Sequence, residues 1–488
     1  MVNSHPHHPP TLRIFFATEM WERYGFYVVQ TLLALYLALH FQWTDKRVYG
    51  LVGSFTALTY LSPVIGGWIA DHLLGQKRAI LTGAVILLCS YLAVMLSMSD
   101  EELTASLAAI AVGTGLLKPN ISSLLGNEYP IGSPNRESGF TIFYIGITTG
   151  ILLGTTIPSY LNTYLGWSAS FLSAAIGLII AIGTFSYGIS HYKIQDYHAF
   201  PLQIKNVTFA VSLMVLLWLL AFYILHDPNI ANTAFILVVL LSVGYILYSV
   251  QHESQTQARK TIVIGLLCLI SVAFWAFYFQ MFLSLTLFLA RMVQPKLFGI
   301  PFAPPYYVGI QSIGMILLGL ILARQKHHVS IEQQGVRTGH KFVLAMISIT
   351  LGYFLIALIS NFSSPISLLS PLAIIPAYLL ISLAELLLSP VGLSAITSLA
   401  SPQKVSTMMG IFFVSLGVGA FLSGKLANLT AIPIGETSTK ILKAHYATAF
   451  SHLLYILVGL TLLCFFLNVL IKYLLTKPIP QMDSPPNM

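Results

Sequence analysis

The stretch Glu19-Met20-Trp21-Glu22-Arg23-Tyr24 places three charged side chains inside the first apolar segment of the chain, residues 12–40. In a membrane-spanning helix, a charge at the bilayer centre costs about 2.5–3.5 kcal/mol by insertion scales. Helical spacing puts Glu19, Glu22 and Arg23 at i, i+3 and i+4, on one face, where they partly compensate one another. The sequence therefore predicts a buried charge cluster in the first helix.

The composition indicates an integral membrane protein. The chain has 488 residues, of which 56% are hydrophobic and 8% are charged, whereas soluble domains carry about 25% charged residues. The net charge of +8 does not require a nucleic-acid partner, because a polytopic protein collects Lys and Arg in its cytoplasmic loops. Cys89, Cys268 and Cys464 lie in apolar segments without metal-ligand spacing, so we expect neither a disulfide framework nor a metal site.

Apolar segments long enough to span a bilayer, about 17–25 residues each, recur along the whole chain. The polar connections between them leave no room for a soluble domain. We therefore predict an all-α polytopic fold with fourteen transmembrane helices, at residues 12–40, 49–70, 78–98, 103–125, 139–161, 167–190, 206–226, 231–250, 261–290, 305–323, 341–361, 369–390, 405–430 and 446–474.

The distribution of basic residues predicts the orientation of these helices. With the N-terminus in the cytoplasm, fifteen Lys and Arg residues fall on the inner side of the membrane and six on the outer side. This excess agrees with the positive-inside rule. We therefore expect both termini to be cytoplasmic.

Five ionisable residues lie well inside the predicted spans: Glu19, Glu22, Arg23, Lys118 and Glu385. The two cations and three anions pair most of the charge and leave one carboxylate able to titrate. Ionisable residues within a membrane mark substrate or proton pathways by default. The alternative is a purely structural polar network.

The second loop has the pattern of a tight connection between two helices. Its glycines, Gly67 and Gly75, permit close helix approach and a turn. Asp71, Lys77 and Arg78 are placed to lock neighbouring helix ends through charge and helix-dipole contacts. This loop resembles the signature loop of the major facilitator superfamily, which implies two six-helix bundles with a substrate site between them near the membrane midplane.

That resemblance divides the chain into five parts. We expect an N-terminal bundle at 12–190, an inserted two-helix linker at 191–260 and a C-terminal bundle at 261–474. The His- and Pro-rich residues 1–11 and the Pro-rich residues 475–488 are expected to be disordered cytoplasmic tails.

Further motifs narrow the resemblance to one family. They are Glu19-x-x-Glu22-Arg23-Tyr24-x-x-Tyr27, Lys118-Pro119-Asn120, the stretch from Phe140 to Ile147, and the stretch from Glu385 to Leu393. Together they resemble the proton-dependent oligopeptide transporter family, whose bacterial members also have fourteen spans with a central pair. The resemblance covers nearly the entire chain.

The resemblance implies a role for each matching residue. Glu19 and Glu22 would take part in proton coupling, with Lys118 as their ionic partner and Arg23 close by. Arg23 would also help to hold the carboxylate of a substrate, because its planar fork gives bidentate geometry. Glu385 would face the substrate's amino terminus from the opposite bundle. Lys118 would also belong to the substrate site, and Tyr27 and Tyr60 would supply hydroxyls to the cavity.

Two departures from the family pattern occur together. Phe279 stands where relatives have a glutamate, and Gln30 stands where they have its arginine partner. Losing one partner would strand a buried charge, whereas losing both can be close to neutral. We therefore expect an intact fold with altered proton coupling between the bundles.

Other cavity positions are also altered, which makes the C-terminal half of the cavity more apolar. Gly314 and Thr148 each replace an asparagine, and Phe412 replaces a tryptophan. We still include these three residues and Phe279 in the expected substrate site. Ala290 stands where relatives commonly have an aspartate that serves the outer gate beside Arg291. We assign a gating or structural role to Arg291 and to the five residues of the second loop named above.

The sequence thus predicts a proton-coupled symporter for di- and tripeptides or related zwitterions, working by alternating access. We expect a monomer in the bacterial inner membrane, with a small-molecule substrate and protons as partners and no cofactor. One alternative is a divergent family member that carries a non-peptide or modified amino-acid compound. The other is a receptor that binds without transporting. An enzyme is not expected, since no catalytic constellation lies at membrane depth.

Overall fold

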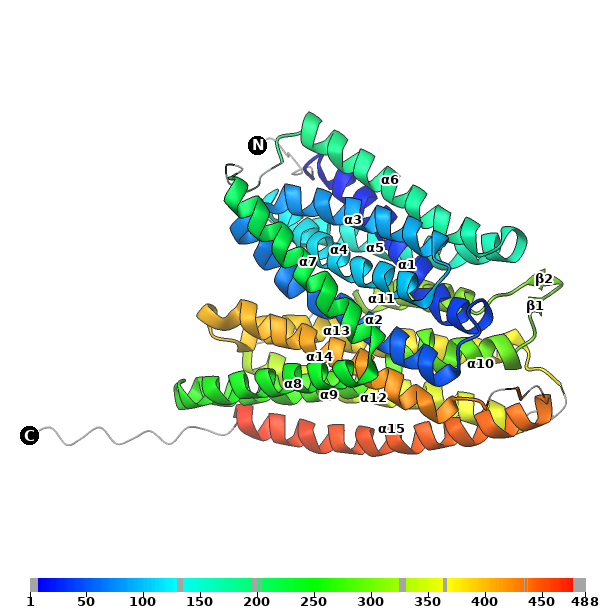
Figure 1. Cartoon of the computed structure of the whole chain (residues 1–488). Coiled ribbons are helices and arrows are strands. Elements are labelled where there is room, and N and C mark those ends of the chain that lie inside the picture. Colours follow the sequence, from blue (N-terminus) through cyan, green and yellow to red (C-terminus); the bar gives the residue numbers. More distant parts are fainter. Residues whose placement is uncertain are drawn as a thin grey trace, which may run out of the picture.

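The computed structural model shows a nearly all-helical protein (Figure 1). It describes residues 8–129, 135–194, 196, 201, 203–323, 331–362, 367–433, 435–436 and 438–476. Most of the two tails expected to be disordered, residues 1–7 and 477–488, therefore lies outside the described residues.

Helices occupy every apolar segment identified in the sequence. In chain order they are α1 (Leu12–Leu39), α2 (Asp45–Ile69), α3 (Gln76–Leu96), α4 (Asp100–Asn127), α5 (Arg136–Leu165), α6 (Trp167–His191), α7 (Ile204–His226), α8 (Pro228–Gln251), α9 (Gln255–Tyr278), α10 (Ser284–Met292), α11 (Pro305–Ala323), α12 (Ile331–Phe362), α13 (Pro371–Leu399), α14 (Val405–Ala427) and α15 (Thr439–Thr476). Short π- or 3₁₀-turns are η1 (Ala70–Leu74), η2 (Phe279–Phe282), η3 (Pro402–Lys404) and η4 (Asn428–Thr430), and the two short strands are β1 (Lys296–Leu297) and β2 (Ile300–Pro301).

Twelve helical segments in the described part of the chain are long and apolar enough to cross a membrane. The polytopic all-α fold class is therefore confirmed. The helices α1 and α11 stand outside this group: α1 contains the three charges of the opening motif, and α11 is a shorter apolar helix. The structure thus supports twelve to fourteen crossings rather than fixing the number at fourteen.

The segment predicted as one span at 261–290 is interrupted in the structure. The helix α9 ends at Tyr278, the turn η2 follows, and Leu283 leaves the helical region with φ −124° and ψ −102° before α10 begins. The buried side chain of Gln280 donates to the carbonyl and hydroxyl oxygens of Ser423 at 2.8 and 3.0 Å. Such side-chain bonds compensate a helix break inside a membrane protein, and hydrophobicity alone did not reveal this one.

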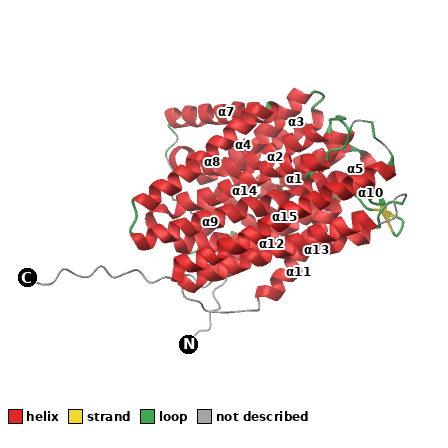
Figure 2. Cartoon of the chain, turned by 90° about the horizontal axis from the view of Figure 1, so that it is seen from below, coloured by secondary structure: helices red, strands yellow, loops and turns green. Residues whose placement is uncertain are grey.

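The helices pack into two sets. The helices α1 to α6 form the first set, in which α2 packs on α4, and α9, α11, α12, α13, α14 and α15 form the second set. The sets meet where α2 packs on α14 and where α5 packs on α11. The helices α7 and α8 of the predicted linker contact both sets. The helix α7 packs on α4 and α2, and α8 packs on α9 and α14. Figures 1 and 2 show this arrangement, with β1 and β2 at the end opposite the chain termini.

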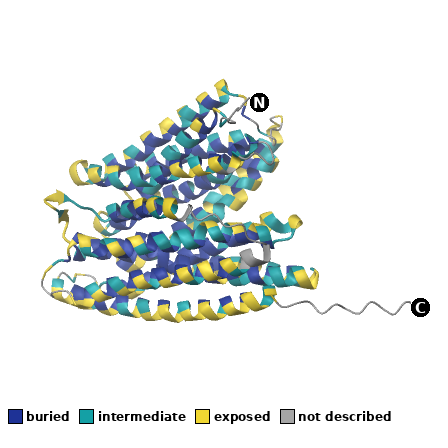
Figure 3. Ribbon diagram, turned by 180° about the vertical axis from the view of Figure 1, so that it is seen from behind, coloured by how far each residue is buried: buried dark blue, intermediate teal, exposed yellow. Residues whose placement is uncertain are grey.

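Buried residues lie where the helices face one another, and exposed residues lie on the outer faces (Figure 3). Many of the exposed residues are large and apolar. Glycines let some helices approach closely. A Cβ atom on Gly66 of α2 would lie 2.0 Å from the carbonyl oxygen of Gly115 in α4, and one on Gly53 would lie 2.9 Å from Gly424 of α14. Small residues at helix contacts are typical of membrane proteins, where close packing holds helices together.

Replacing Gly66 with Ala should lower the thermal unfolding midpoint in detergent by several degrees, because the new methyl group meets the backbone of α4. Overpacking of this kind costs about 1–3 kcal/mol. The matched control is Gly67→Ala, whose Cβ would lie 3.9 Å from Pro119, an ordinary contact. Equal midpoints for the two variants would contradict the tight α2–α4 contact.

Candidate functional site

The opening motif forms a buried ion cluster on α1. The side chains of Glu19, Glu22 and Arg23 are almost completely buried. Arg23 donates to both oxygens of Glu22, through Nε at 2.5 Å and Nη2 at 2.7 Å, and its Nε lies 3.4 Å from Oε1 of Glu19. The second oxygen of Glu19 is buried without a hydrogen-bond partner among the described residues. The predicted mutual compensation on one helix face is therefore present in the structure.

Lys118 lies on α4, next to Pro119 within the helix. Its ammonium group stands 4.6 Å from the ring centre of Tyr60, which provides a cation–π contact. The ion pairs found among the described residues do not join Lys118 to Glu19 or Glu22. In this conformation Arg23, rather than Lys118, is the direct ionic partner of the two carboxylates.

Glu385 lies at the middle of α13, in the other set of helices. Its Oε2 atom accepts a hydrogen bond from the hydroxyl of Tyr278 at 2.8 Å and one from Nε2 of Gln311 at 2.6 Å. Both bonds end on the same oxygen, and no hydrogen bond to Oε1 is found among the described residues. Glu385 is thus held in place by α9 and α11 but carries no cation partner among the described ion pairs.

A small cavity of about 30 Å³ opens beside Glu385. It lies between the two sets of helices, because its walls come from α1, α5, α9, α11 and α13. Three of the predicted substrate-site residues line it, namely Tyr27, Thr148 and Glu385. The other lining residues are Tyr144, Ile151, Tyr278, Val308, Gln311, Ser312 and Met315.

The positions of the missing ion pair have acquired different contacts. The amide of Gln30 donates to the hydroxyl of Thr56 at 2.9 Å, while its Oε1 atom is buried without a partner. Phe279 lies in an aromatic cluster, with its ring centre 5.3 Å from Trp275 and 5.4 Å from Tyr60. The fold therefore accommodates the joint loss, as expected. Its effect on coupling stays a prediction.

Two further predicted substrate-site residues lie at helix contacts. A Cβ on Gly314 would meet the hydroxyl of Ser382 at 2.6 Å, so this glycine lets α11 pack tightly on α13. Phe412 is buried against Gly392 of α13, where an added Cβ would approach its ring at 2.5 Å. Neither lines the cavity beside Glu385, and their contribution to substrate binding stays a prediction.

The second loop forms a compact turn. Asp71 lies in the π-helical turn η1, and Gly75 follows with φ +80°, a conformation that favours glycine. The backbone amide of Lys77 donates to Asp196 at 3.1 Å, and Arg78 donates to the carbonyl of Leu74 at 3.4 Å. The close helix approach expected of Gly67 is instead made by its neighbour Gly66, as described above.

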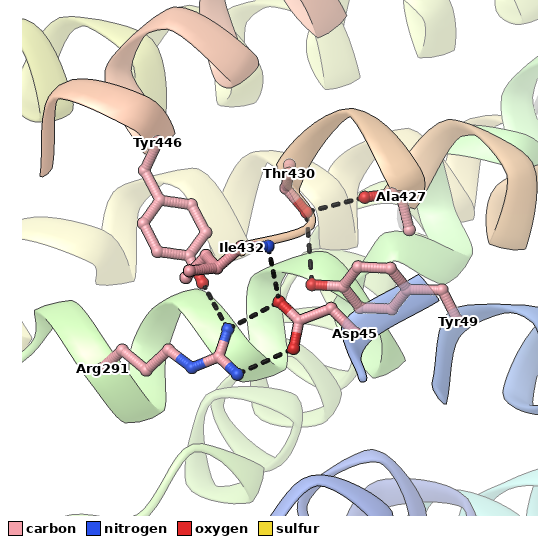
Figure 4. A network of polar contacts seen from close by, with 7 residues as sticks. All are labelled: Asp45, Tyr49, Arg291, Ala427, Thr430, Ile432 and Tyr446. Atoms are coloured by element: carbon pink, nitrogen blue, oxygen red, sulfur yellow. Dashed lines mark hydrogen bonds and ion pairs between the residues drawn. The ribbon is translucent and has the colours of Figure 1, made fainter. Parts of the chain in front are cut away.

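Arg291 closes the opposite end of the molecule (Figure 4). It donates two parallel hydrogen bonds to Asp45 of α2, at 2.7 and 2.8 Å, and a third bond to the hydroxyl of Tyr446 at 3.1 Å. Asp45 also accepts from the backbone amide of Ile432 at 3.1 Å. This network ties α2, α10 and α15 together at the end that carries β1 and β2, which we call the closed end.

Comparison with known proteins decides the family. The model of the POT family matches residues 77–442. The chain belongs to the POT family. It is 31% identical over 438 residues to the dipeptide and tripeptide permease A of Edwardsiella piscicida, covering 88% of each chain. It is 30% identical over 433 residues to the dipeptide and tripeptide permease B of Photorhabdus asymbiotica subsp. asymbiotica, again covering 88% of each.

The structural comparison agrees with this assignment. The fold is similar to that in the crystal structure of tetrameric PepTSo2, with a TM-score of 0.82, 26% identity, and coverage of 95% of this chain and 99% of that one. POT family membership makes this protein a membrane transporter rather than an enzyme. The resemblance drawn from the sequence motifs is confirmed.

Sequence reasoning missed several residues of this candidate site. Tyr144, Tyr278 and Gln311 line the cavity, and the last two bind Glu385 directly. Tyr144 lies within the quoted stretch from Phe140 to Ile147, Tyr278 directly precedes Phe279, and Gln311 is a polar residue in an apolar span, but none of the three was singled out. Asp45 was missed as the partner of Arg291, since only the fold brings residues this far apart in sequence together.

Replacing Asp45 with Asn should lower the thermal unfolding midpoint by several degrees, because Arg291 loses its charged partner. Removing one member of a buried pair costs about 3–5 kcal/mol, and we expect less here because the Arg291 side chain is 27% exposed. The control is Asp100→Asn in the exposed Arg47–Asp100 pair, where exposed pairs contribute about 0.2–1 kcal/mol. An equal decrease of the unfolding midpoint in the two variants would contradict a larger contribution of the closed-end network to stability.

Proposed function

We propose that this protein carries di- and tripeptides, or related zwitterionic solutes, together with protons across the membrane by alternating access. The supporting relatives are named dipeptide and tripeptide permeases and align over most of the chain. A zwitterion needs a cation at one end of its site and an anion at the other. This chain supplies Arg23 and Lys118 from one set of helices and Glu385 from the other.

The observation that carries the proposal is a continuous path of contacts between these opposite charges. Lys118 stands over the ring of Tyr60, the ring centre of Tyr60 lies 5.4 Å from Phe279, and that of Phe279 lies 5.4 Å from Tyr278. The hydroxyl of Tyr278 then donates to Glu385. Cation and anion thus face one aromatic wall from opposite sets of helices, with the small cavity beside it.

The ion cluster on α1 suggests how substrate and proton are coupled. Glu22 engages the Nε and Nη2 atoms of Arg23 in this conformation. A substrate carboxylate that binds this same edge of Arg23 competes with Glu22 for these donors. Once Glu22 loses this cation, its buried charge is uncompensated, and proton uptake relieves the cost. Substrate binding and protonation of Glu22 are then linked events.

The organisation of the chain follows the same scheme. We propose bundles at 12–190 and 261–474 joined by the linker 191–260, which the two packing sets support. We also propose a monomer in the bacterial inner membrane with both termini cytoplasmic, on the basis of the positive-inside bias. The closed end would then face outward, and Arg291 would serve its gate.

A second candidate substrate is a non-peptide or modified amino-acid compound. The observation that favours it is the apolar character of Phe279, Gly314 and Phe412, which supply no polar group to a peptide backbone. A receptor that binds without transporting is the third reading. Both are separated from peptide transport by one experiment.

The test is uptake of radiolabelled dialanine into proteoliposomes under an inward proton gradient. Accumulation above the level of protein-free vesicles supports the proposal, and collapse of the gradient with a protonophore should remove it. Binding without uptake would favour the receptor. Absence of both would contradict peptide transport and leave the modified compound.

Replacing Glu22 with Gln should abolish gradient-driven dialanine accumulation and spare counterflow exchange, because the neutral side chain cannot exchange a proton. The matched control is Glu101→Gln at the exposed start of α4, which should accumulate normally. Normal accumulation by Glu22→Gln would remove Glu22 from the coupling role.

Replacing Glu385 with Ala should reduce affinity for dialanine at least tenfold, because the carboxylate no longer meets the amino group. Affinity for N-acetyl-dialanine, which lacks that positive charge, should change little. Competition against labelled dialanine in membranes measures both. Equal losses for the free and acetylated peptides would show that Glu385 does not recognise the amino terminus.

A further inference from the structure

A second and larger cavity, of about 370 Å³, lies at the closed end, away from the site described above. Its walls come from the start of α2, the turn between α7 and α8, and the end of α14. The ionisable lining residues are Lys46 and Arg47 from α2, His226 from α7, and Lys425 from α14. In the described part of the chain no carboxylate lines this cavity, although Asp100 pairs with Arg47.

The lysines of this cavity have free binding capacity. Among the described ion pairs, neither Lys46 nor Lys425 has a carboxylate partner. The Lys425 ammonium stands 5.2 Å from the ring centre of Phe421, and Arg47 lies over Trp43 at 3.6 Å while pairing with Asp100. Positive charge therefore gathers around a concave space, where it favours an anion.

A neutral lining residue also lacks its partner. The side-chain oxygen of Asn428 is buried without a hydrogen bond. The cavity thus offers ammonium and guanidinium donors together with one amide oxygen that can accept a hydrogen bond.

The rest of the lining is apolar. Leu51, Ile224, Leu225, Ala231 and Phe421 contribute to it, and Leu422 and Leu429 are exposed on the neighbouring surface of α14 and η4. A ligand for this site therefore combines a negative head with an apolar body. The cavity lies where several transmembrane helices end, which is the depth of phospholipid headgroups.

We propose that this cavity binds the phosphate headgroup of an anionic phospholipid. The headgroup would bridge Lys46 and Arg47 of α2 to Lys425 of α14. These two helices touch directly below, at Gly53 and Gly424, and belong to different packing sets. A bound lipid therefore holds the closed end shut together with the Asp45–Arg291 pair, because a ligand stabilises the state that it binds better. The turn between α7 and α8 covers the headgroup.

The test is a thermal unfolding series on the full chain in a neutral detergent, with added phosphatidylglycerol or phosphatidylcholine. We expect phosphatidylglycerol to raise the midpoint by several degrees more than phosphatidylcholine. The double variant K46Q/K425Q should lose this difference and keep its midpoint in phosphatidylcholine. The matched control K296Q/K440Q removes the same charge from exposed positions outside the cavity and should keep the difference.

Three results would overturn the proposal. The first is an equal response of wild type and K46Q/K425Q to phosphatidylglycerol. The second is the same loss in K296Q/K440Q, which would indicate general surface charge. The third is an equal shift with inorganic phosphate alone, which would assign the site to a free anion. If K46Q/K425Q does not fold, the variant K46R/K425R keeps the positive charge and should retain the larger shift with phosphatidylglycerol. Absence of that larger shift in K46R/K425R would count against the proposal. None of these results depends on peptide transport.

Discussion

The bidentate pairing of Arg23 with Glu22 is the constraint on which the rest of the site depends. Three ionisable groups lie within two turns of one buried helix, and an unpaired charge there would cost several kcal/mol. Arg23 satisfies Glu22 completely and Glu19 only in part, since one Glu19 oxygen has no partner. The charges of this cluster are thus only partly paired, so an added anion or proton changes which carboxylate Arg23 binds.

The counterpart of this cluster is a carboxylate without a cation. Glu385 is oriented by Tyr278 and Gln311 through one oxygen, and its second oxygen remains available. Because the cluster and Glu385 lie on different sets of helices, a zwitterion that satisfies both also joins the two sets. Substrate recognition and the relative position of the helices are then parts of one equilibrium, which is the physical requirement for alternating access.

Two kinds of contact at the closed end hold its helices together. Asp45 and Arg291 form a bidentate pair, and glycines bring the backbones of α2 and α14 together. To open this end, the protein must separate a charge pair and expose tightly packed backbone. A ligand bridging α2 and α14 would add to that cost.

The sequence was sufficient for the helix positions, the family and the charges of the site. Hydrophobic length identifies each span, and isolated charges within apolar segments are conspicuous. The partners of those charges were harder to predict. Asp45 and Arg291 lie far apart in sequence, and Gln311 is an ordinary polar residue until the fold places it against Glu385. The break at Phe279–Leu283 was missed because its residues are apolar apart from Gln280 and include no glycine or proline.

Linkage between peptide and proton movement is the central claim. Its most direct measurement uses proteoliposomes that contain a pH-sensitive dye, to which dialanine is added on the outside at equal internal and external pH. The account predicts acidification of the interior that depends on dialanine and disappears in Glu22→Gln. Uptake of labelled dialanine without any acidification would contradict it.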